Sequence, residues 1–283
     1  MEMIKQWIKS IRYFLRRIVN GYCNPLYKID TVKLFDKTYK IYKGTFGGID
    51  KDDAWYATLV RDAKVIFDIG ANVGWTALLA HVYGSPLKVV LIDPNPNALA
   101  YAAGNMIMND FSENSIFIKS FVADKVGEKV KFFTVDVGAA GSMYSSHAKT
   151  ASSLNSWYWV STITVDELTT KLNIFPDLIK IDVEGAEHLV LLGASKLCSL
   201  NKVKVFVEMH SNRELSMAKN AELILSWCAE QGYKAWYLTT GDELITPSQI
   251  ASRGRCHLLL LPSSYEYPVQ FKSIKQGDAL PSL

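Results

Sequence analysis

The sequence has few cysteines and places them far apart. Its four, Cys23, Cys198, Cys228 and Cys256, form no Cys-x-x-Cys pair, and no histidine lies at the spacing of a zinc finger. A disulfide framework and a structural zinc site are therefore both disfavoured. The pattern predicts the reduced thiols of a cytosolic protein.

Long apolar runs and strong net charge are also missing. No apolar run is long enough to cross a bilayer, and the N-terminus lacks the uninterrupted apolar stretch and cleavage site of a signal peptide. The formal net charge of +3 is too small for a protein whose affinity comes from phosphate contacts. We therefore expect a cytoplasmic protein without a nucleic-acid partner.

The composition is that of a chain able to build one substantial core. Hydrophobic residues make up 49% of its 283 residues and charged residues 21%. This is enough for one large domain and does not demand two. We place this domain at residues 25–283, after a helical extension at residues 1–24.

The extension carries the pattern of a basic amphipathic helix. Apolar residues recur at helical spacing from Ile4 to Val19, and basic residues from Lys5 to Arg17 fall mainly on another stripe. Such a helix suits peripheral contact with an anionic membrane through residues 1–20. Its apolar face can also cover the domain or a second subunit, so membrane association and packing both remain open.

Beyond residue 64 the chain alternates between strand and helix patterns. The expected core strands are apolar runs without polar alternation, as in strands that are buried on both faces. They span Val65–Ile69, Val89–Ile92, Ile116–Val122, Leu178–Ile181 and Val203–Val207, and a closing antiparallel pair is expected at Tyr233–Leu238 and His257–Leu261. This alternation predicts a Rossmann-like α/β fold with a mostly parallel, seven-stranded sheet and helices on both faces.

A glycine-rich turn joins the first of these strands to the following helix. It reads DIGANVG over residues 68–74. Gly70, Asn72 and Gly74 are candidate cofactor contacts, because glycines let the backbone approach a ligand closely. A dinucleotide-binding turn prefers glycine at the first position of the motif, which is residue 68 here, and the turn receives a pyrophosphate. Asp68 would instead repel a pyrophosphate and attract the sulfonium and ammonium groups of S-adenosylmethionine.

Two further acids follow the next two strands. Asp93 stands at the tip of the second strand, where an acid can accept both hydroxyls of an adenosine ribose. That interaction serves NAD and S-adenosylmethionine alike. Asp124 follows the third strand. It is a candidate partner for the adenine amino group, or else a solvated turn residue.

The most specific stretch is the run KIDVEGAE at residues 180–187. Asp182 and Glu184 lie before the next helix, at the carboxyl end of a central strand, where ligands bind in open α/β sheets. The helix macrodipole explains Glu187 but not the two acids before the helix. We therefore expect Asp182 and Glu184 to contact the cofactor.

Together these motifs resemble the FkbM family of S-adenosylmethionine-dependent methyltransferases. The resemblance rests on residues 68–74, on LIDPNPNA at 91–98 and on residues 179–194, and it covers residues 60–210. It implies a class I methyltransferase fold and O-methylation of a saccharide or natural-product hydroxyl. One departure is Asp93, where many members carry Glu, but either residue can hold a ribose.

Glu208 and His210 follow the fifth strand, on the edge of the sheet that also carries Asp182. Methyl transfer to a hydroxyl needs in-line placement and usually the loss of the hydroxyl proton. His210 is a candidate base. Alternatively, Asp182, Glu208 and His210 hold a divalent cation that lowers the pKa of the hydroxyl. Glu208 and His210 can also serve only as hydrogen-bond partners of the substrate or of neighbouring loops.

The expected acceptor is a hydroxylated small molecule or a glycan, bound largely by residues 138–160. Trp157, Tyr158 and Trp159 suit stacking on a sugar face, although the alternation of faces along a strand favours packing for at least one tryptophan.

Two other functions fit the fold. An NAD-dependent oxidoreductase is disfavoured by Asp68. A non-catalytic scaffold that binds a membrane or a partner is disfavoured by the intact acids.

Overall fold

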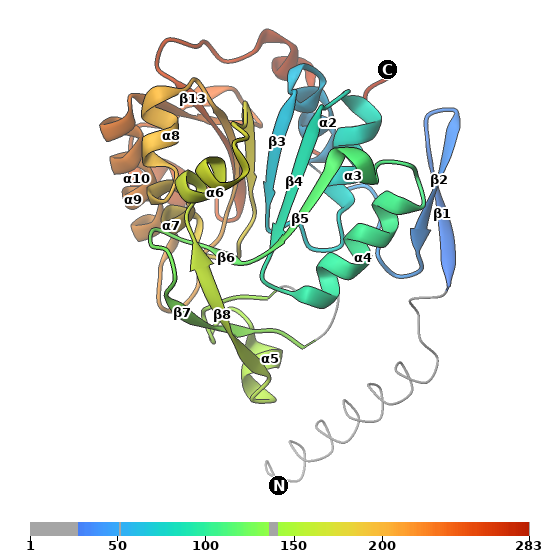
Figure 1. Ribbon diagram of the computed structural model, residues 1–283. Helices are drawn as coiled ribbons and strands as arrows, with labels where there is room; N and C mark the ends of the chain where they lie inside the picture. The colour runs from blue at the N-terminus through green and yellow to red at the C-terminus, as the bar shows by residue number, and fades with distance from the viewer. Residues whose placement is uncertain (1–27, 51, 136–140, 283) are drawn as a thin grey trace, which may run out of the picture.

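One large sheet forms the centre of the molecule in the computed structural model, which describes residues 28–50, 52–135 and 141–282 (Figure 1). Its strand order is β12 (Asp242–Glu243), β11 (Tyr233–Tyr237), β13 (Cys256–Pro262), β10 (Lys204–Met209), β9 (Leu178–Ile181), β3 (Val65–Ile69), β4 (Lys88–Asp93) and β5 (Ser115–Lys119). The strands from β10 to β5 are parallel, and β13 runs antiparallel to both of its neighbours. The predicted α/β class and the closing antiparallel pair are confirmed. The sheet has eight strands rather than seven, because β12 pairs with β11 beyond that pair.

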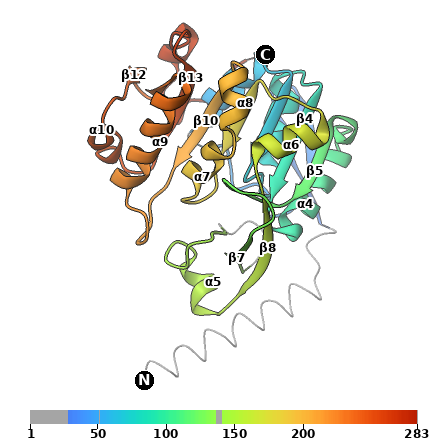
Figure 2. The same ribbon diagram turned by 60° about the vertical axis from the view of Figure 1, so that its left-hand side comes forward.

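Helices cover both faces of this sheet (Figures 1 and 2). On one face lie α2 (Asp53–Leu59), α3 (Trp75–Tyr83) and α4 (Pro96–Ile107). On the other face lie α6 (Val165–Leu172), α7 (Glu187–Leu192), α8 (Ser195–Leu200), α9 (Met217–Gln231) and α10 (Pro247–Ala251). Successive strand residues point to opposite faces, so Ile66 packs with the first group of helices and Phe67 with the second. Burial on both faces explains the uninterrupted apolar strands of the sequence.

A hairpin of β1 (Ile29–Leu34) and β2 (Lys37–Tyr42) belongs to the α2–α4 side. The backbone N–H of Tyr42 donates to Asn105 Oδ1 at 2.9 Å, and the N–H of Lys40 donates to Asn109 Oδ1 at 2.8 Å. Both asparagines lie on α4 or directly after it, so they attach the hairpin to that helix. Short 3₁₀ turns are η2 (Val60–Asp62), η3 (Ser112–Asn114) and η4 (Val269–Ser273).

The chain between β5 and β9 forms a second sheet with the order β6 (Phe121–Val122), β8 (Trp157–Ile163) and β7 (Lys129–Phe133). With the short helix α5 (Lys149–Ser153), β7 and β8 project from one edge of the large sheet (Figure 2). Phe132 of β7 lines a cavity together with residues from the carboxyl ends of β3 and β4. The second sheet therefore borders the edge where a ligand is expected.

One predicted element, the N-terminal helix of residues 1–24, lies outside the described residues, as do its expected membrane contacts. The boundary between this extension and the domain stays a prediction. Within the described residues, no helix is both long and apolar enough to span a membrane.

Candidate active site

The ends of β3 and β9 touch at Gly70. The backbone N–H of Asp182 donates to the carbonyl of Ile69 at 3.0 Å, and a Cβ atom on Gly70 would lie only 1.8 Å from the carbonyl oxygen of Asp182. Gly70 also has a φ of 81°, which favours glycine. Glycine is needed here so that the two strand ends can meet. The predicted approach of a ligand to Gly70 stays a prediction.

A first cavity lies over the ends of β3 and β4, and we call it the β4 cavity. It encloses about 630 Å³, part of which is open to solvent. Its lining includes Ile69, Gly70, Asn72, Ile92, Asp93, Pro94, Phe121, Val122, Phe132, Gly141, Asp182 and Glu184. Apolar side chains and backbone form most of these walls, as in a typical small-molecule site of this size.

Asp93 is the fixed polar group of the β4 cavity. Its carboxylate oxygens accept the backbone N–H of Asn72 at 2.8 Å and of Asn95 at 2.7 Å. Burial raises the pKa of Asp93 to about 6, although these two hydrogen bonds oppose the shift. The side chain is therefore mainly ionised at neutral pH. Each oxygen has a second lone pair, with which it can accept a ribose hydroxyl.

Two residues predicted to contact the cofactor, Gly74 and Asp124, line neither cavity described here. A Cβ on Gly74 would lie 3.0 Å from the Cβ of Ala102, so this glycine serves the packing of α3 against α4. The sequence predicts one strand over Ile116–Val122 with Asp124 at its tip. The structure breaks that stretch into β5 and β6, and Phe121 of β6 lines the β4 cavity whereas Asp124 does not.

Asp68 is fully buried and also lines neither cavity. Its Oδ2 accepts the hydroxyl of Thr76 at 2.6 Å, and its Oδ1 lies 3.5 Å from Nζ of Lys180. Burial would lower the pKa of Lys180, but Asp182 and Asp68 raise it by more, so the lysine stays charged. Asp68 thus forms a buried ion pair, and its attraction for a cationic cofactor stays a prediction.

A second cavity lies beside the start of α2, and we call it the α2 cavity. It encloses about 750 Å³, including open solvent space. Its lining includes Asp50, Asp52, Asp53, Tyr56, Gly70, Asn72, Trp75, Thr76, Lys180, Asp182, Phe206, Glu208 and His257. Gly70, Asn72 and Asp182 line both cavities. Asp182 therefore stands where the two cavities meet.

Hydrogen bonds and ion pairs hold the acids of the α2 cavity in place. Asp53 accepts the indole N–H of Trp75 at 2.9 Å, and burial raises the pKa of Asp53 to about 6. His257 lies between Asp52, 2.9 Å from Nδ1, and Glu208, 3.5 Å from Nε2. Burial would lower the pKa of His257, but these two carboxylates raise it to about 9. His257 is therefore a cation at neutral pH.

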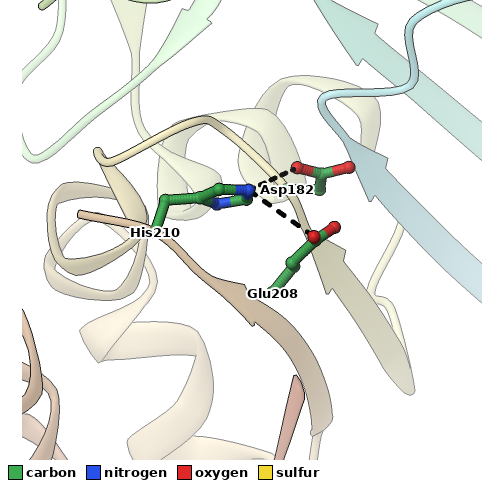
Figure 3. Close-up of side chains that lie close together, drawn as sticks. All are labelled: Asp182, Glu208 and His210. Carbon is green, nitrogen blue, oxygen red and sulfur yellow. Dashed lines mark ion pairs between the residues drawn. The ribbon is translucent and has the colours of Figure 1, made fainter. Parts of the chain in front are cut away.

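Asp182, Glu208 and His210 come together at the ends of β9 and β10, as predicted (Figure 3). Nε2 of His210 lies 3.5 Å from Glu208 Oε1 and 3.9 Å from Asp182 Oδ1. Glu184 brings a third carboxylate to within 3.3 Å of the same nitrogen. On the other side of the ring, Nδ1 lies 2.9 Å from Glu187 Oε1.

These neighbours argue against His210 as the base. Burial alone would lower its pKa, but Glu187 and Glu208 raise the pKa of His210 to about 11. An imidazole with that pKa is protonated at neutral pH and has no lone pair for a substrate proton. The pKa of Asp182, in contrast, is raised by burial despite the opposing charge of Lys180.

The aromatic triplet in β8 does not form a stacking platform in either cavity. Trp157 and Trp159 contact each other with ring centroids 5.6 Å apart, and both lie near the ammonium of Lys131. The hydroxyl of Tyr158 donates to the carbonyl of Pro94 at 2.9 Å. Of the described residues in the predicted acceptor segment 138–160, Gly141 is the one that lines either of these two cavities.

Several site residues are not assigned from the sequence. His147 forms a hydrogen bond with Glu184, and its ring meets that of His210 edge-on, with centroids 5.7 Å apart. A lone histidine in a polar loop gives no signal of this. Lys180 and Glu187 belong to the KIDVEGAE run. The many charged residues in that run are the sequence signal that could have identified these two residues.

Comparisons with known proteins agree with the motifs. The family model described as "Methyltransferase FkbM domain" matches residues 68–235. No curated protein sequence matches the chain significantly. The matched segment begins in β3 and ends in β11, so it contains Asp93, Asp182, Glu208 and His210.

Solved methyltransferase structures are also similar to the chain, at low sequence identity. Methyltransferase FkbM from Methylobacillus flagellatus KT aligns with a TM-score of 0.46 and 16% identity, covering 70% of this chain and 44% of that one. A SAM-dependent methyltransferase from Agrobacterium tumefaciens gives a TM-score of 0.46 and 13% identity, with 84% and 71% covered. An O-methyltransferase from Bacillus cereus in complex with SAH gives 0.43 and 14%, with 75% and 80% covered.

The chain thus spans less than half of the Methylobacillus protein's length. The family match itself extends over more than half of the present chain. It includes the glycine-rich turn, the β4 cavity's anchoring acid and the cluster at the ends of β9 and β10. The protein therefore belongs to the FkbM family of S-adenosylmethionine-dependent methyltransferases.

Proposed function

We propose that the protein transfers the methyl group of S-adenosylmethionine to a hydroxyl of a saccharide or natural product. The observation that carries this proposal is the position of Asp182, which borders both the β4 cavity and the α2 cavity. A cofactor in one cavity and an acceptor in the other would meet at this carboxylate. The acceptor oxygen attacks the methyl carbon, the carbon–sulfur bond breaks with its electron pair going to sulfur, and a base takes the hydroxyl proton.

The β4 cavity suits the adenosine end of the cofactor. Ionised Asp93 can accept the two ribose hydroxyls, and Phe121 and Phe132 offer apolar surface to the base. Gly70 and Asp182, which also line the α2 cavity, would then lie toward the sulfonium. The negative charge of Asp182 favours that cationic group.

The α2 cavity suits an acceptor that carries several hydroxyl groups. Asp52, Asp53 and Glu208 offer carboxylate oxygens, which accept hydrogen bonds from hydroxyls. Trp75 lines the same space and offers an aromatic surface to a sugar ring. Hydroxyl donors and apolar ring faces together are the chemistry of a saccharide.

Asp182 is the best-placed acceptor for the hydroxyl proton. Burial raises its pKa, which makes the carboxylate a stronger base than an ordinary aspartate. Its side chain is still 27% exposed, so a bound hydroxyl can reach it. In this arrangement His210 holds the neighbouring carboxylates in place through its positive charge and does not take the proton.

A transfer assay with methyl-labelled S-adenosylmethionine tests this proposal on hydroxylated glycans, natural products and small metabolites. We expect label in an ether product with the wild type, and almost none with Asp182→Asn. Label found only on amines or thiols would overturn O-methylation and leave cofactor use intact. Calorimetry that detects NAD but not S-adenosylmethionine would overturn methyl transfer itself in favour of an oxidoreductase.

A further inference from the structure

We propose that His210, Glu208 and Asp182 bind a divalent first-row transition-metal cation at the ends of β9 and β10 (Figure 3). One ligand atom from each residue, a ring nitrogen and two carboxylate oxygens, lies within 4.8 Å of the others. The separations from Nε2 are 3.5 Å to Glu208 and 3.9 Å to Asp182. Such separations suit ligands that each lie about 2.0–2.2 Å from one shared ion.

Two buried atoms of this cluster have no hydrogen-bond partner among the described residues. They are Nε2 of His210 and Oδ1 of Asp182, and His210 is only 3% exposed. Buried polar atoms are nearly always paired, so an unpaired one points to an ion or a water. Because the two atoms face each other across 3.9 Å, one cation between them satisfies both.

Glu187 holds the histidine in the form that a metal requires. Its Oε1 lies 2.9 Å from His210 Nδ1 and accepts the backbone N–H of Gly185 at 2.9 Å, and its Oε2 accepts the amide of Asn220 at 2.9 Å. A carboxylate can only accept hydrogen bonds, so Nδ1 carries a proton. Nε2 is then the nitrogen that can exchange its proton for a metal, and a carboxylate behind the ligating ring is the usual partner in metal sites.

Without a metal, Nε2 carries a proton. It lies near the carboxylates of Glu184 and Glu208 but, among the described residues, meets neither in hydrogen-bonding geometry. A cation that replaces this proton would satisfy Nε2. Other cations lie around the acids: Lys180 pairs with Asp182 Oδ2, and Arg255 pairs with Glu208. The side chain of Arg255 is 64% exposed, so it can turn into solvent when an ion takes its place.

The mixed donor set selects the cation. A nitrogen with two carboxylate oxygens suits Mn²⁺, Fe²⁺ or Zn²⁺, whereas Mg²⁺ and Ca²⁺ prefer oxygen ligands alone. Three protein ligands leave coordination positions open to a substrate oxygen. In the proposed methyl transfer, which this role presupposes, the cation lowers the pKa of the acceptor hydroxyl.

Titration of chelator-treated, cofactor-free, full-length protein with Mn²⁺ tests the site without any methyl acceptor. We expect one Mn²⁺ per chain by calorimetry, a higher melting temperature, and Mg²⁺ affinity lower by at least about tenfold. Asp182→Asn and Glu208→Gln should each weaken Mn²⁺ binding, and Glu187→Gln should weaken it about 10–100-fold. Asp93→Asn changes a carboxylate on the same edge but outside the cluster, and should leave Mn²⁺ affinity unchanged.

Nitrogen NMR of His210 with Zn²⁺ gives a second measurement on the wild type, which does not depend on whether a variant folds. Zn²⁺ should remove the proton from Nε2 and leave the one on Nδ1. Retention of both ring protons at saturating Zn²⁺ would overturn the proposal, as would Mn²⁺ binding that is absent or equally strong in wild type and Asp182→Asn. Failure to find a methyl acceptor, in contrast, leaves these results intact, so the two proposals fail separately.

Discussion

The two halves of the carboxyl edge of the sheet hold their polar groups in different ways. At the ends of β3 and β4, backbone groups fix a single acid, because the N–H groups of Asn72 and Asn95 both donate to Asp93. At the ends of β9 and β10, side chains fix one another, and His210 has four carboxylates around its ring. The first arrangement depends on turn geometry and the second on balanced charge.

This difference matches two chemical tasks. A nucleoside needs a shaped space and an acceptor held in one place, which backbone conformation supplies. Moving a proton or holding a cation needs ionisable side chains that lie close enough to change one another's protonation. Gly70 joins the two halves. Asp182 belongs to the second half and Asp93 to the first, so substitutions at these two positions should separate the tasks.

The largest effect is expected where the halves touch. In Gly70→Ala the new Cβ would lie 1.8 Å from the carbonyl oxygen of Asp182, so β3 and β9 must move apart. We expect the free energy of unfolding to fall by more than about 3 kcal/mol in urea denaturation. Gly127→Ala is a matched control, because Gly127 has the same φ of 81° and no atom within 4 Å of an added Cβ.

That control should lose only about 1–2 kcal/mol, the cost of the backbone conformation. Equal losses in the two variants would show that the contact between the halves is unimportant for stability.

The next largest effect should come from the chemical half. Asp182→Asn keeps the shape of the side chain and removes its charge, so kcat should fall by about 10²–10⁴-fold, the usual range for a lost proton acceptor. Affinity for S-adenosylhomocysteine should change far less, because Asp93 still holds the ribose. Calorimetry and initial rates together check this, and equal losses of kcat and affinity would contradict the division.

Asp93→Asn should show the opposite pattern. Replacing a charged acceptor of two ribose hydroxyls should weaken S-adenosylhomocysteine binding about 10–100-fold, since hydrogen bonds to charged groups contribute about 1.5–3 kcal/mol each. At saturating cofactor, kcat should be nearly that of wild type. A variant with normal affinity would remove Asp93 from the cofactor site.

The binding half should also carry a pH dependence. The pKa of Asp93 is raised to about 6, and its ionised form accepts the ribose hydroxyls. Protonation as the pH falls through this value removes an acceptor, so affinity for S-adenosylhomocysteine should drop about tenfold between pH 7 and pH 5. Asp93→Asn has no charge to lose and should show a flatter profile. A steep decline in that variant would assign the dependence to another group.

The smallest effect on turnover is expected from deleting residues 1–20. Among the described residues, neither cavity is lined by a residue before Asp50, so kcat with a soluble acceptor should stay within about twofold. Co-sedimentation with anionic vesicles shows whether the segment binds membranes, and a lower melting temperature of the deletion shows whether it packs on the domain. Full-length protein without vesicle binding, together with unchanged stability, would reject both roles.

The sequence predicts the features that follow from local pattern. Apolar runs locate the parallel strands, and residues just after such strands share one edge of the sheet, which brings Asp182, Glu208 and His210 together. Asp93 is predicted for the same reason. These inferences need only the order of the strands, and no detail of side-chain packing.

Features that depend on contacts between distant segments leave no trace in local pattern. Asp68 looks free to meet a cofactor until Lys180, 112 positions later in the chain, pairs with it. His210 looks like a base until its carboxylate neighbours raise its pKa. The break between β5 and β6, which precedes Asp124, arises from pairing of β6 with β8, which local propensity does not reveal.

A crystal structure with S-adenosylhomocysteine tests the division of the edge most directly. We expect the ribose hydroxyls on the carboxylate of Asp93 and the sulfur beside Asp182, with the α2 cavity left open for the acceptor. Adenosine bound in the α2 cavity, among Asp52, Asp53 and Trp75, would contradict it.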